Sequence, residues 1–178
     1  HDVFCTVSEI TARECESLLG STVDVVTPNG FEDDFVWNGR EFDEKRAEAR
    51  RAMIRTAEAT LSCKFDGEPL IVGTSGRYEF RNKGIDIFLD ALKQLAETDA
   101  LDREVLVYIT VPSATTGPRK DLQAHLADEN SPIDPKQNRF CTHYLEHPEW
   151  DQILNSIAGS VLANPSSKVK VVFVPTYL

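Results

Sequence analysis

The hydrophobic pattern changes period along the chain, and these changes predict alternating strands and helices. Continuous apolar runs at residues 70–75, 104–111 and 168–175 are typical of strands buried on both faces of a parallel sheet. Between the first two runs lies one apolar stripe at helical spacing, formed by Ile85, Phe88, Leu89, Leu92 and Leu95. The order strand, helix, strand predicts an α/β fold with a Rossmann-like parallel sheet and flanking helices.

Shorter signals predict further elements on both sides of this unit. Residues 3–7 and 22–30 have strand-like patterns, and the helix between them begins at the N-cap Ser8 and stops at Gly20. One helix is expected near residues 119–129. Another is expected over 148–163, with an apolar side made of Trp150, Ile153, Leu154, Ile157 and Val161.

Residues 31–67 interrupt the rhythm of strands. They begin as an acidic, aromatic and irregular stretch and continue as a charged, alanine-rich helix over residues 40–61. We interpret this segment as a connection between two α/β units. Because His1 replaces an initial Met and strand-like sequence lies close to both ends, we expect the chain to be an internal piece of a longer protein.

The acidic composition restricts the binding partners. The 178 residues include 29 acidic and 19 basic side chains, which gives a formal net charge of −10. This charge disfavours general binding to nucleic acids and anionic membranes. No stretch approaches the roughly 20 consecutive apolar residues of a membrane span, and no export leader is recognised. We therefore expect no nucleic-acid partner, no membrane partner and a cytoplasmic location.

The four cysteines, at positions 5, 15, 63 and 141, show no CxxC pair and no disulfide-framework spacing. Reduced thiols in a cytosolic protein are the interpretation that this favours. Cys141, His143 and His147 have a C-x-H-x3-H spacing that could supply part of a zinc site, but no fourth ligand is obvious. A buried thiol beside loop histidines is the preferred interpretation, so no metal is expected.

The segment GTSGRYEFRNKG, residues 73–84, concentrates cations in this acidic chain. It carries Arg77, Arg81 and Lys83 with one anion, Glu79, and it joins a predicted buried strand to a predicted helix. In doubly wound sheets, ligands bind where such loops lead into helix N-termini, whose positive dipole end favours phosphate. The loop is therefore a candidate anion site.

The spacing alone leaves two interpretations of this loop open. It matches neither the Walker P-loop nor the G-x-G-x-x-G pattern, so it is either a nucleotide-phosphate site or a solvated, charged turn. Arg77 is the preferred phosphate ligand, because a guanidinium after a strand-ending glycine can donate to two phosphate oxygens at once.

Several segments together resemble one known family. In chain order they are VFCTVSEITARECESLL, DVVTPNGF, GRYEFRNKG with DIFLDAL, CTHYLEHPEWDQILNSI and KVKVVFVPTYL. The third resembles the signature of the eukaryotic-type glycogen synthases, which are retaining glycosyltransferases, and the match covers nearly the whole chain. The resemblance implies transfer of glucose from UDP-glucose to the non-reducing end of an α-1,4-glucan, with retention of configuration.

The resemblance also implies a GT-B architecture, in which two Rossmann-like domains enclose the active site. On this template, residues 1–30 end the N-terminal domain, residues 31–67 connect the domains, and residues 68–178 form the first part of the C-terminal, nucleotide-binding domain. Asn29 and Gly30 would lie where the chain crosses between the domains.

Roles for the loop residues follow from the same resemblance. The family's Arg and Lys that contact the donor diphosphate correspond to Arg77 and Lys83, which would neutralise charge on the departing nucleoside diphosphate without a metal or another cofactor. Glu79 is expected to orient Arg77 or pair with a neighbouring cation, since a carboxylate among three cations is held ionised. The supporting residues are Gly76, Glu79, Arg81, Asn82, Gly84 and Asn29.

Two departures from the family limit these expectations. The family's two glutamates, eight residues apart in a later motif, would lie beyond Leu178, so we expect no catalytic residue within the chain and no activity from the chain alone. The family's glucose-phosphate-sensing arginines are absent as well. Residues 112–140 are much shorter than the helical insert that the family uses in tetramer contacts, so homo-oligomerisation of the full-length protein stays open.

Two other functions remain compatible with the residues. One is a non-catalytic α/β module that binds a nucleotide sugar or another anion, and a downstream Glu-x7-Glu motif would favour the enzyme over it. The other is a GT-B glycosyltransferase with another donor or acceptor. No residue distinguishes UDP from ADP or identifies the acceptor.

Overall fold

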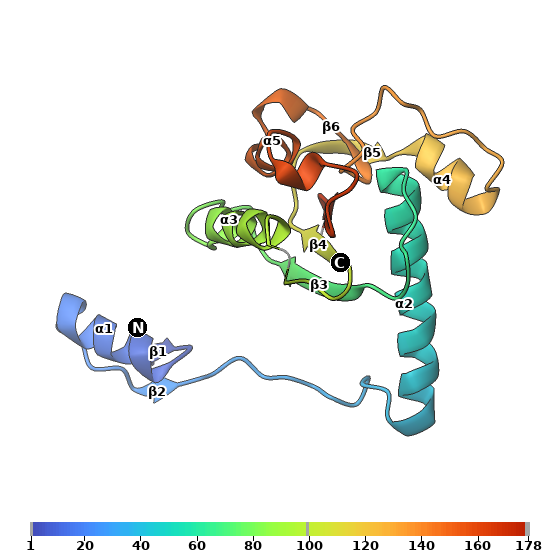
Figure 1. Cartoon of the computed structure of the whole chain (residues 1–178). Coiled ribbons are helices and arrows are strands. Elements are labelled where there is room, and N and C mark those ends of the chain that lie inside the picture. Colours follow the sequence, from blue (N-terminus) through green and yellow to red (C-terminus); the bar gives the residue numbers. More distant parts are fainter. Residues whose placement is uncertain (1, 99, 177–178) are drawn as a thin grey trace. The chain divides into compact units, whose positions relative to one another are not determined.

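The structure is a computed structural model that describes residues 2–98 and 100–176 (Figure 1). It contains two compact units, and the boundary between them along the chain lies between Lys45 and Arg46. The first unit holds β1 (Cys5–Thr6), α1 (Glu9–Leu19), β2 (Val25–Val26) and the start of α2 (Gly39–Leu61). The second unit holds the rest of α2 and all later elements.

The first unit is a small β-α-β arrangement, as the sequence predicts. β1 and β2 pair in parallel, with Cys5 opposite Val25. Ser8 caps α1, because its hydroxyl oxygen accepts a hydrogen bond from the Thr11 N–H at 3.1 Å. The helix ends at Gly20, whose left-handed φ of 65° suits a residue without a side chain. The predicted cap and stop of this helix are confirmed.

The second unit is built on three parallel strands in the order β3-β4-β7. Their bounds are Leu70–Ser75 for β3, Val105–Thr110 for β4 and Val169–Val174 for β7. β4 is central and almost wholly buried, as its continuous apolar run predicts. The outer side of β7 is partly covered, because the Phe173 N–H donates to the Phe140 carbonyl at 2.7 Å and the Thr142 N–H donates to the Phe173 carbonyl at 3.1 Å.

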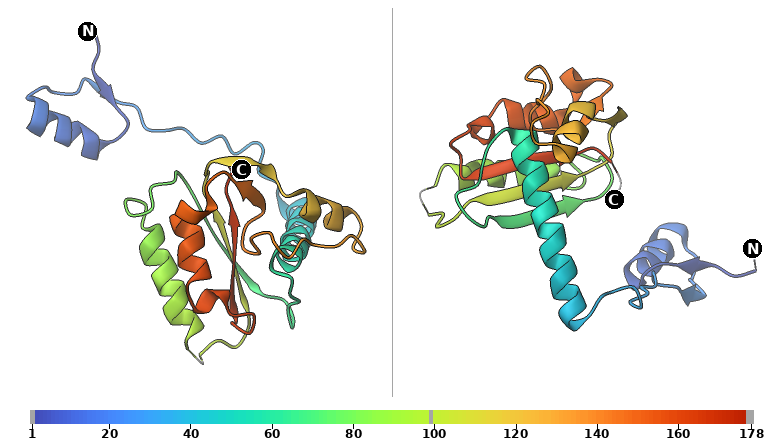
Figure 2. Two further views of the ribbon diagram at one scale, coloured as in Figure 1. Left: turned by 90° about the horizontal axis from the view of Figure 1, so that it is seen from above. Right: turned by 90° about the vertical axis from the view of Figure 1, so that its right-hand side faces the viewer.

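Helices cover both faces of this sheet (Figure 2). On one face, α3 (Ile85–Ala96) and α5 (Gln152–Ala158) pack on alternate strand residues such as Val107 and Val171. On the other face, the C-terminal part of α2 packs through Ala57 on Leu106 and Val172. The predicted α/β class with a parallel sheet and flanking helices is therefore confirmed.

The predicted apolar stripe of α3 is confirmed, whereas the prediction for residues 148–163 is partly wrong. Instead of one helix, this segment forms a 3-10 turn at Pro148–Trp150, α5, and a second 3-10 turn at Val161–Ala163. The physical reason is the Asp151 side chain, which accepts a hydrogen bond from the Leu154 N–H at 2.9 Å and so begins a new helix. Trp150 lies outside that helix and is 74% exposed, so it is not part of the buried side.

Residues 115–145 form a subsidiary layer, whose helix confirms the one predicted near residues 119–129 but whose two strands were not predicted. β5 (Thr115–Pro118) pairs antiparallel with β6 (His143–Leu145), and α4 (Lys120–Ala127) follows β5. Arg119 lies at their junction and is 1% exposed. Its guanidinium donates to both carboxylate oxygens of Asp121, at 3.1 and 2.6 Å, and to the Asn138 carbonyl at 2.8 Å. This buried ion pair ties the layer together.

No helix in the part of the chain that the structure describes is long and apolar enough to cross a membrane. The long helix α2 confirms the predicted helix over residues 40–61. The first half of this helix is exposed and carries charges of both signs. From Met53 onward the helix packs on the sheet of the second unit.

Arg119→Ala should strongly destabilise the second unit. The variant leaves the Asp121 carboxylate, which is 12% exposed, without its cation, so we expect a loss of about 3–5 kcal/mol in the free energy of unfolding. Urea unfolding followed by circular dichroism measures it. Arg103→Ala, at a 60% exposed arginine 3.7 Å from Asp102, is the matched control and should change stability by less than about 1 kcal/mol. Equal losses would show that the Arg119 pair does not hold the layer.

Candidate functional site

The three parallel strands end level, and this brings their following loops to one edge of the sheet. Ser75 of β3 is opposite Thr110 of β4, and Thr110 is opposite Val174 of β7. The residues after Ser75 and Thr110 therefore leave the sheet side by side. This carboxyl edge is where ligands bind in parallel α/β sheets.

The loop after β3 turns into α3 through two glycines with left-handed backbone angles. Gly76 has a φ of 152° directly after the strand, and Gly84 has a φ of 66° directly before the helix. A side chain at either position would strain the backbone. Between them, the Lys83 N–H donates to the Glu79 carbonyl at 2.9 Å and the Gly84 N–H donates to the Arg81 carbonyl at 2.9 Å. The loop is thus a closed series of turns at the helix N-terminus.

The charged side chains of this loop point into solvent. Arg77 is 70% exposed, and its Nη2 lies 3.1 Å from Glu79 Oε1, so the expected pairing of Glu79 with Arg77 is present. Arg81, Asn82 and Lys83 are also exposed. Since residues 73–84 hold three cations and one carboxylate, the loop keeps an excess of positive charge in an acidic chain. Such a loop can attract a phosphate group.

Tyr78 anchors this loop to α5, and sequence reasoning missed this role. Its phenol oxygen accepts hydrogen bonds from the N–H groups of Gln152 at 3.1 Å and Ile153 at 3.2 Å. The ring packs against the main core. The residue between Arg77 and Glu79 is therefore held by the first turn of a helix that is remote in sequence. A tyrosine within a charged loop is the only local signal for such an anchor.

Burial of Tyr78 raises its pKa to about 12, and the nearby Asp151 charge acts in the same direction. The phenol therefore stays neutral at physiological pH. A neutral phenol oxygen can accept hydrogen bonds from backbone N–H groups and keep its own proton.

Other residues singled out in the sequence lie elsewhere. Asn29 is exposed in the first unit, and the structure does not place that unit relative to the loop. Cys141 is buried, and burial raises the pKa of its thiol to about 11. Among the described residues, no three His, Cys, Asp or Glu side chains are grouped to hold a metal ion.

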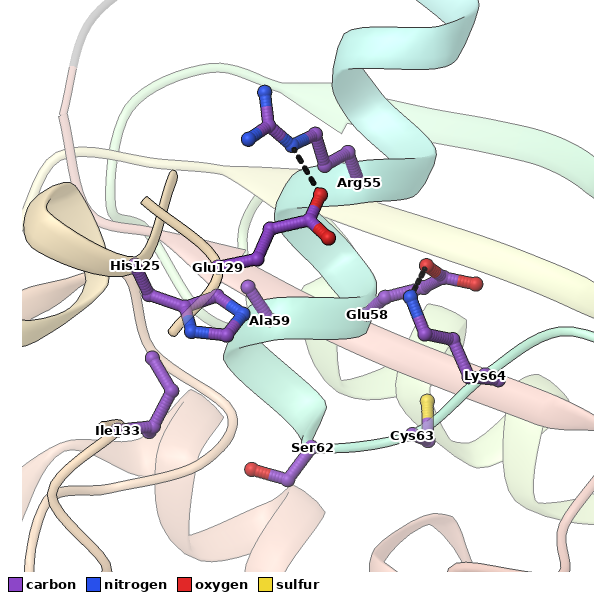
Figure 3. Close-up of a pocket in the computed structure, with 9 residues that line it drawn as sticks. All are labelled: Arg55, Glu58, Ala59, Ser62, Cys63, Lys64, His125, Glu129 and Ile133. Atoms are coloured by element: carbon purple, nitrogen blue, oxygen red, sulfur yellow. Dashed lines mark hydrogen bonds and ion pairs between the residues drawn. The ribbon is translucent and has the colours of Figure 1, made fainter. Parts of the chain in front are cut away.

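A larger concavity, of about 540 Å³, lies away from this edge, between the end of α2 and the α4 region (Figure 3). Its charges are paired: Lys64 Nζ lies 2.6 Å from Glu58 Oε2, and Arg55 Nε lies 3.6 Å from Glu129 Oε1. None of the predicted site residues lines it. Because its charges cancel, it offers less to an anion than the loop after β3 does.

A family model described as "Glycogen synthase" matches residues 1–127. Among curated proteins, the glycogen [starch] synthase of Neurospora crassa is 29% identical over 99% of this chain and 33% of its own length. The liver glycogen [starch] synthase of Homo sapiens is 40% identical over 64% of this chain and 17% of its own length. The glycogen [starch] synthase of Dictyostelium discoideum is 36% identical over 64% of this chain and 14% of its own length.

The chain thus spans a third or less of the length of these relatives. The alignment with the Neurospora crassa protein runs over 234 positions, whereas the chain has 178 residues. At least 56 of those positions therefore have no residue in this chain. The Neurospora crassa protein therefore carries residues within the aligned region that have no counterpart in this chain.

Tyr78→Phe should weaken the junction between the loop and α5. The variant removes the oxygen that accepts the partly buried Ile153 N–H, so we expect the free energy of unfolding to fall by about 1–3 kcal/mol. Urea unfolding measures this change. Phe fits the same space, so a full loss of folded structure would contradict the proposed hydrogen-bonding role and indicate a packing defect.

The raised pKa of Tyr78 predicts a specific alkaline behaviour. The folded protein retains the phenol proton until the pH approaches its pKa of about 12, whereas the unfolded chain loses it near the ordinary tyrosine pKa of 10.0. Stability should therefore decline as pH rises from 10.0 towards 12, and less so in Tyr78→Phe. A difference titration of ultraviolet absorbance between the two proteins isolates this tyrosine. A midpoint near 10.0 would refute the shift.

Proposed function

The chain belongs to the glycogen synthase family, and on that basis we propose that the full-length protein is a retaining glycosyltransferase. It transfers a glucosyl group from UDP-glucose to the non-reducing end of an α-1,4-glucan. The observation that supports this best is the cationic loop between Gly76 and Gly84, which lies at the carboxyl edge of a parallel sheet and leads into a helix N-terminus.

The chemistry assigned to this loop is charge neutralisation. When the bond between the anomeric carbon and the diphosphate oxygen breaks, the leaving diphosphate gains negative charge. The Arg77 guanidinium and the Lys83 ammonium, both exposed, donate hydrogen bonds to its oxygens and stabilise that charge. Glu79, 3.1 Å from Arg77, holds the guanidinium in place before the donor binds. These two cations do the work for which other enzymes use a metal, and the proposal includes no cofactor.

The proposal assigns the remaining catalytic groups to residues outside this chain. The two carboxylates expected for the family would follow Leu178, so the 178-residue chain binds the donor weakly and transfers no glucose by itself. The full-length enzyme acts in the cytoplasm, where UDP-glucose and α-glucan are its substrates.

In the full-length protein, Arg77→Ala and Lys83→Ala should each lower kcat by about 10²–10³-fold, since each removes a cation that acts mainly in the transition state. The melting temperature should barely move, because the Arg77 side chain is 70% exposed and Lys83 is exposed as well. Release of UDP in the presence of UDP-glucose and glycogen measures the rate.

The matched control for this experiment is Arg103→Ala. Arg103 is an exposed arginine before the amino end of β4, at the opposite edge of the sheet, and its loss should leave kcat unchanged. If the loop variants keep the activity of the control, the donor-diphosphate role is wrong.

The 178-residue chain should bind UDP weakly, and Arg77→Ala should reduce that binding at least about tenfold, which corresponds to one charge-assisted hydrogen bond. Isothermal titration calorimetry measures both affinities. Equal binding by the variant and the unaltered chain would place the diphosphate contact elsewhere. Binding of UDP by a full-length protein that transfers no glucose would support the non-catalytic module instead.

A further inference from the structure

A second concavity, of about 460 Å³, opens at the carboxyl edge of the sheet beside the loop after β3. It is lined by residues of three segments, among them Tyr78 from the loop, Ser113 after β4, and His147, Trp150, Asp151 and Gln152 before and at the start of α5. Its volume lies within the range of about 300–1,000 Å³ that small-molecule sites occupy. The wall opposite the loop is formed by His147 and Trp150, and the donor-diphosphate role proposed for the loop does not involve it.

That wall is an exposed aromatic pair. The Trp150 indole is 74% exposed, and it stacks on the His147 ring with centroids 5.2 Å apart and planes 25° apart. The backbone holds the pair from both ends, since the Trp150 N–H donates to the His147 carbonyl at 3.2 Å and Asp151 caps α5. A tryptophan presented in this way offers a large, flat and fixed surface to a ligand.

The floor of the concavity carries a buried carboxylate. Asp151 is 7% exposed, and its Oδ2 accepts a hydrogen bond from the Ser113 hydroxyl at 3.1 Å, while Oδ1 accepts one from the Leu154 N–H at 2.9 Å. The Tyr78 phenol is hydrogen-bonded to the same carboxylate. The two oxygens together have about four acceptor positions, so one position remains for a further hydrogen bond. The site therefore combines an aromatic wall with an acceptor for a hydrogen-bond donor.

These features fit a pyranose ring better than a nucleobase. A glucose unit presents C–H groups on its faces, which the negative face of an aromatic ring attracts, and hydroxyl donors around its rim. A uracil edge presents two carbonyl acceptors and one N–H donor, so an acceptor-only carboxylate suits it poorly. The charge of the floor also disfavours the diphosphate itself.

We propose that this concavity binds a glucose unit of the α-glucan chain, with Trp150 as the stacking surface and Asp151 as the hydrogen-bond acceptor. This inference rests on the proposed function, because it is the glucan substrate that makes a glucose unit the ligand. It adds a glucan-binding subsite that is separate from the donor-diphosphate loop and shares only Tyr78 with it.

Direct binding tests the proposal on the 178-residue chain, with maltotetraose as the probe. The chain has two tryptophans, and Trp37→Phe leaves Trp150 as the one indole. Titration of that variant with maltotetraose should give a saturable change in tryptophan fluorescence. No change, together with no heat of binding in calorimetry, would overturn the proposal.

The matched pair of variants is Trp150→Ala and Trp37→Ala. Trp37 is also exposed, at 51%, and lies in the first unit. Trp150→Ala should weaken maltotetraose binding about tenfold, as the loss of one aromatic contact implies. Trp37→Ala should bind as tightly as the unaltered chain. Equal affinities in the two variants would overturn the proposal, and unchanged melting temperatures exclude misfolding as the cause of a loss.

A UDP titration separates this proposal from the donor site. Arg77→Ala should lose UDP binding and keep maltotetraose binding, and Trp150→Ala should do the reverse. If Trp150→Ala loses UDP binding and UDP displaces maltotetraose, the concavity holds the nucleobase and the glucan proposal fails. If the chain binds maltotetraose but Arg77→Ala binds UDP normally, the donor assignment fails and the glucan subsite stands.

Discussion

β4 shares a ladder of backbone hydrogen bonds with β3 on one side and β7 on the other, and the three strands run parallel and in register. The loop after β3 and the segment after β4 depend on this ladder for their positions. The ladder makes the loop with Arg77 and the segment with Ser113 leave the sheet at the same edge. A slip of one residue would exchange the faces of Leu106 and Val107, so burial on both faces opposes it.

A second layer supports the concavity from outside the main sheet. Arg119 holds the Asn138 carbonyl and the Asp121 carboxylate, and the strand pair β5–β6 continues from this cluster. The Glu146 N–H then donates to the Ala114 carbonyl at 3.0 Å, next to His147. The backbone that carries the aromatic wall thus continues from strands that begin and end beside this buried ion pair.

The sequence predicts those elements whose residues repeat one pattern of burial along their whole length. β4 is buried on both faces and α3 has one apolar stripe, so their periods identify them. Trp150 shows the limit, since its spacing fits a helical stripe, but the side chain of Asp151 starts the helix one residue later. The charges of the loop after β3 were evident from composition, and their pairing with Glu79 from proximity. The anchor from Tyr78 to Gln152 spans 74 residues, and no local pattern encodes such a contact.

The two outer strands of the main sheet differ in one respect. β7 is partly covered by residues 140–142, whereas β3 has no strand on its outer side within the described residues. The peptide groups along that side of β3 can accept an additional strand, and Leu70 adds an apolar side chain that is 49% exposed. In a longer protein, this edge is where the sheet can be extended. In the isolated chain it is the place where two copies can associate, so binding measurements are best made at low protein concentration.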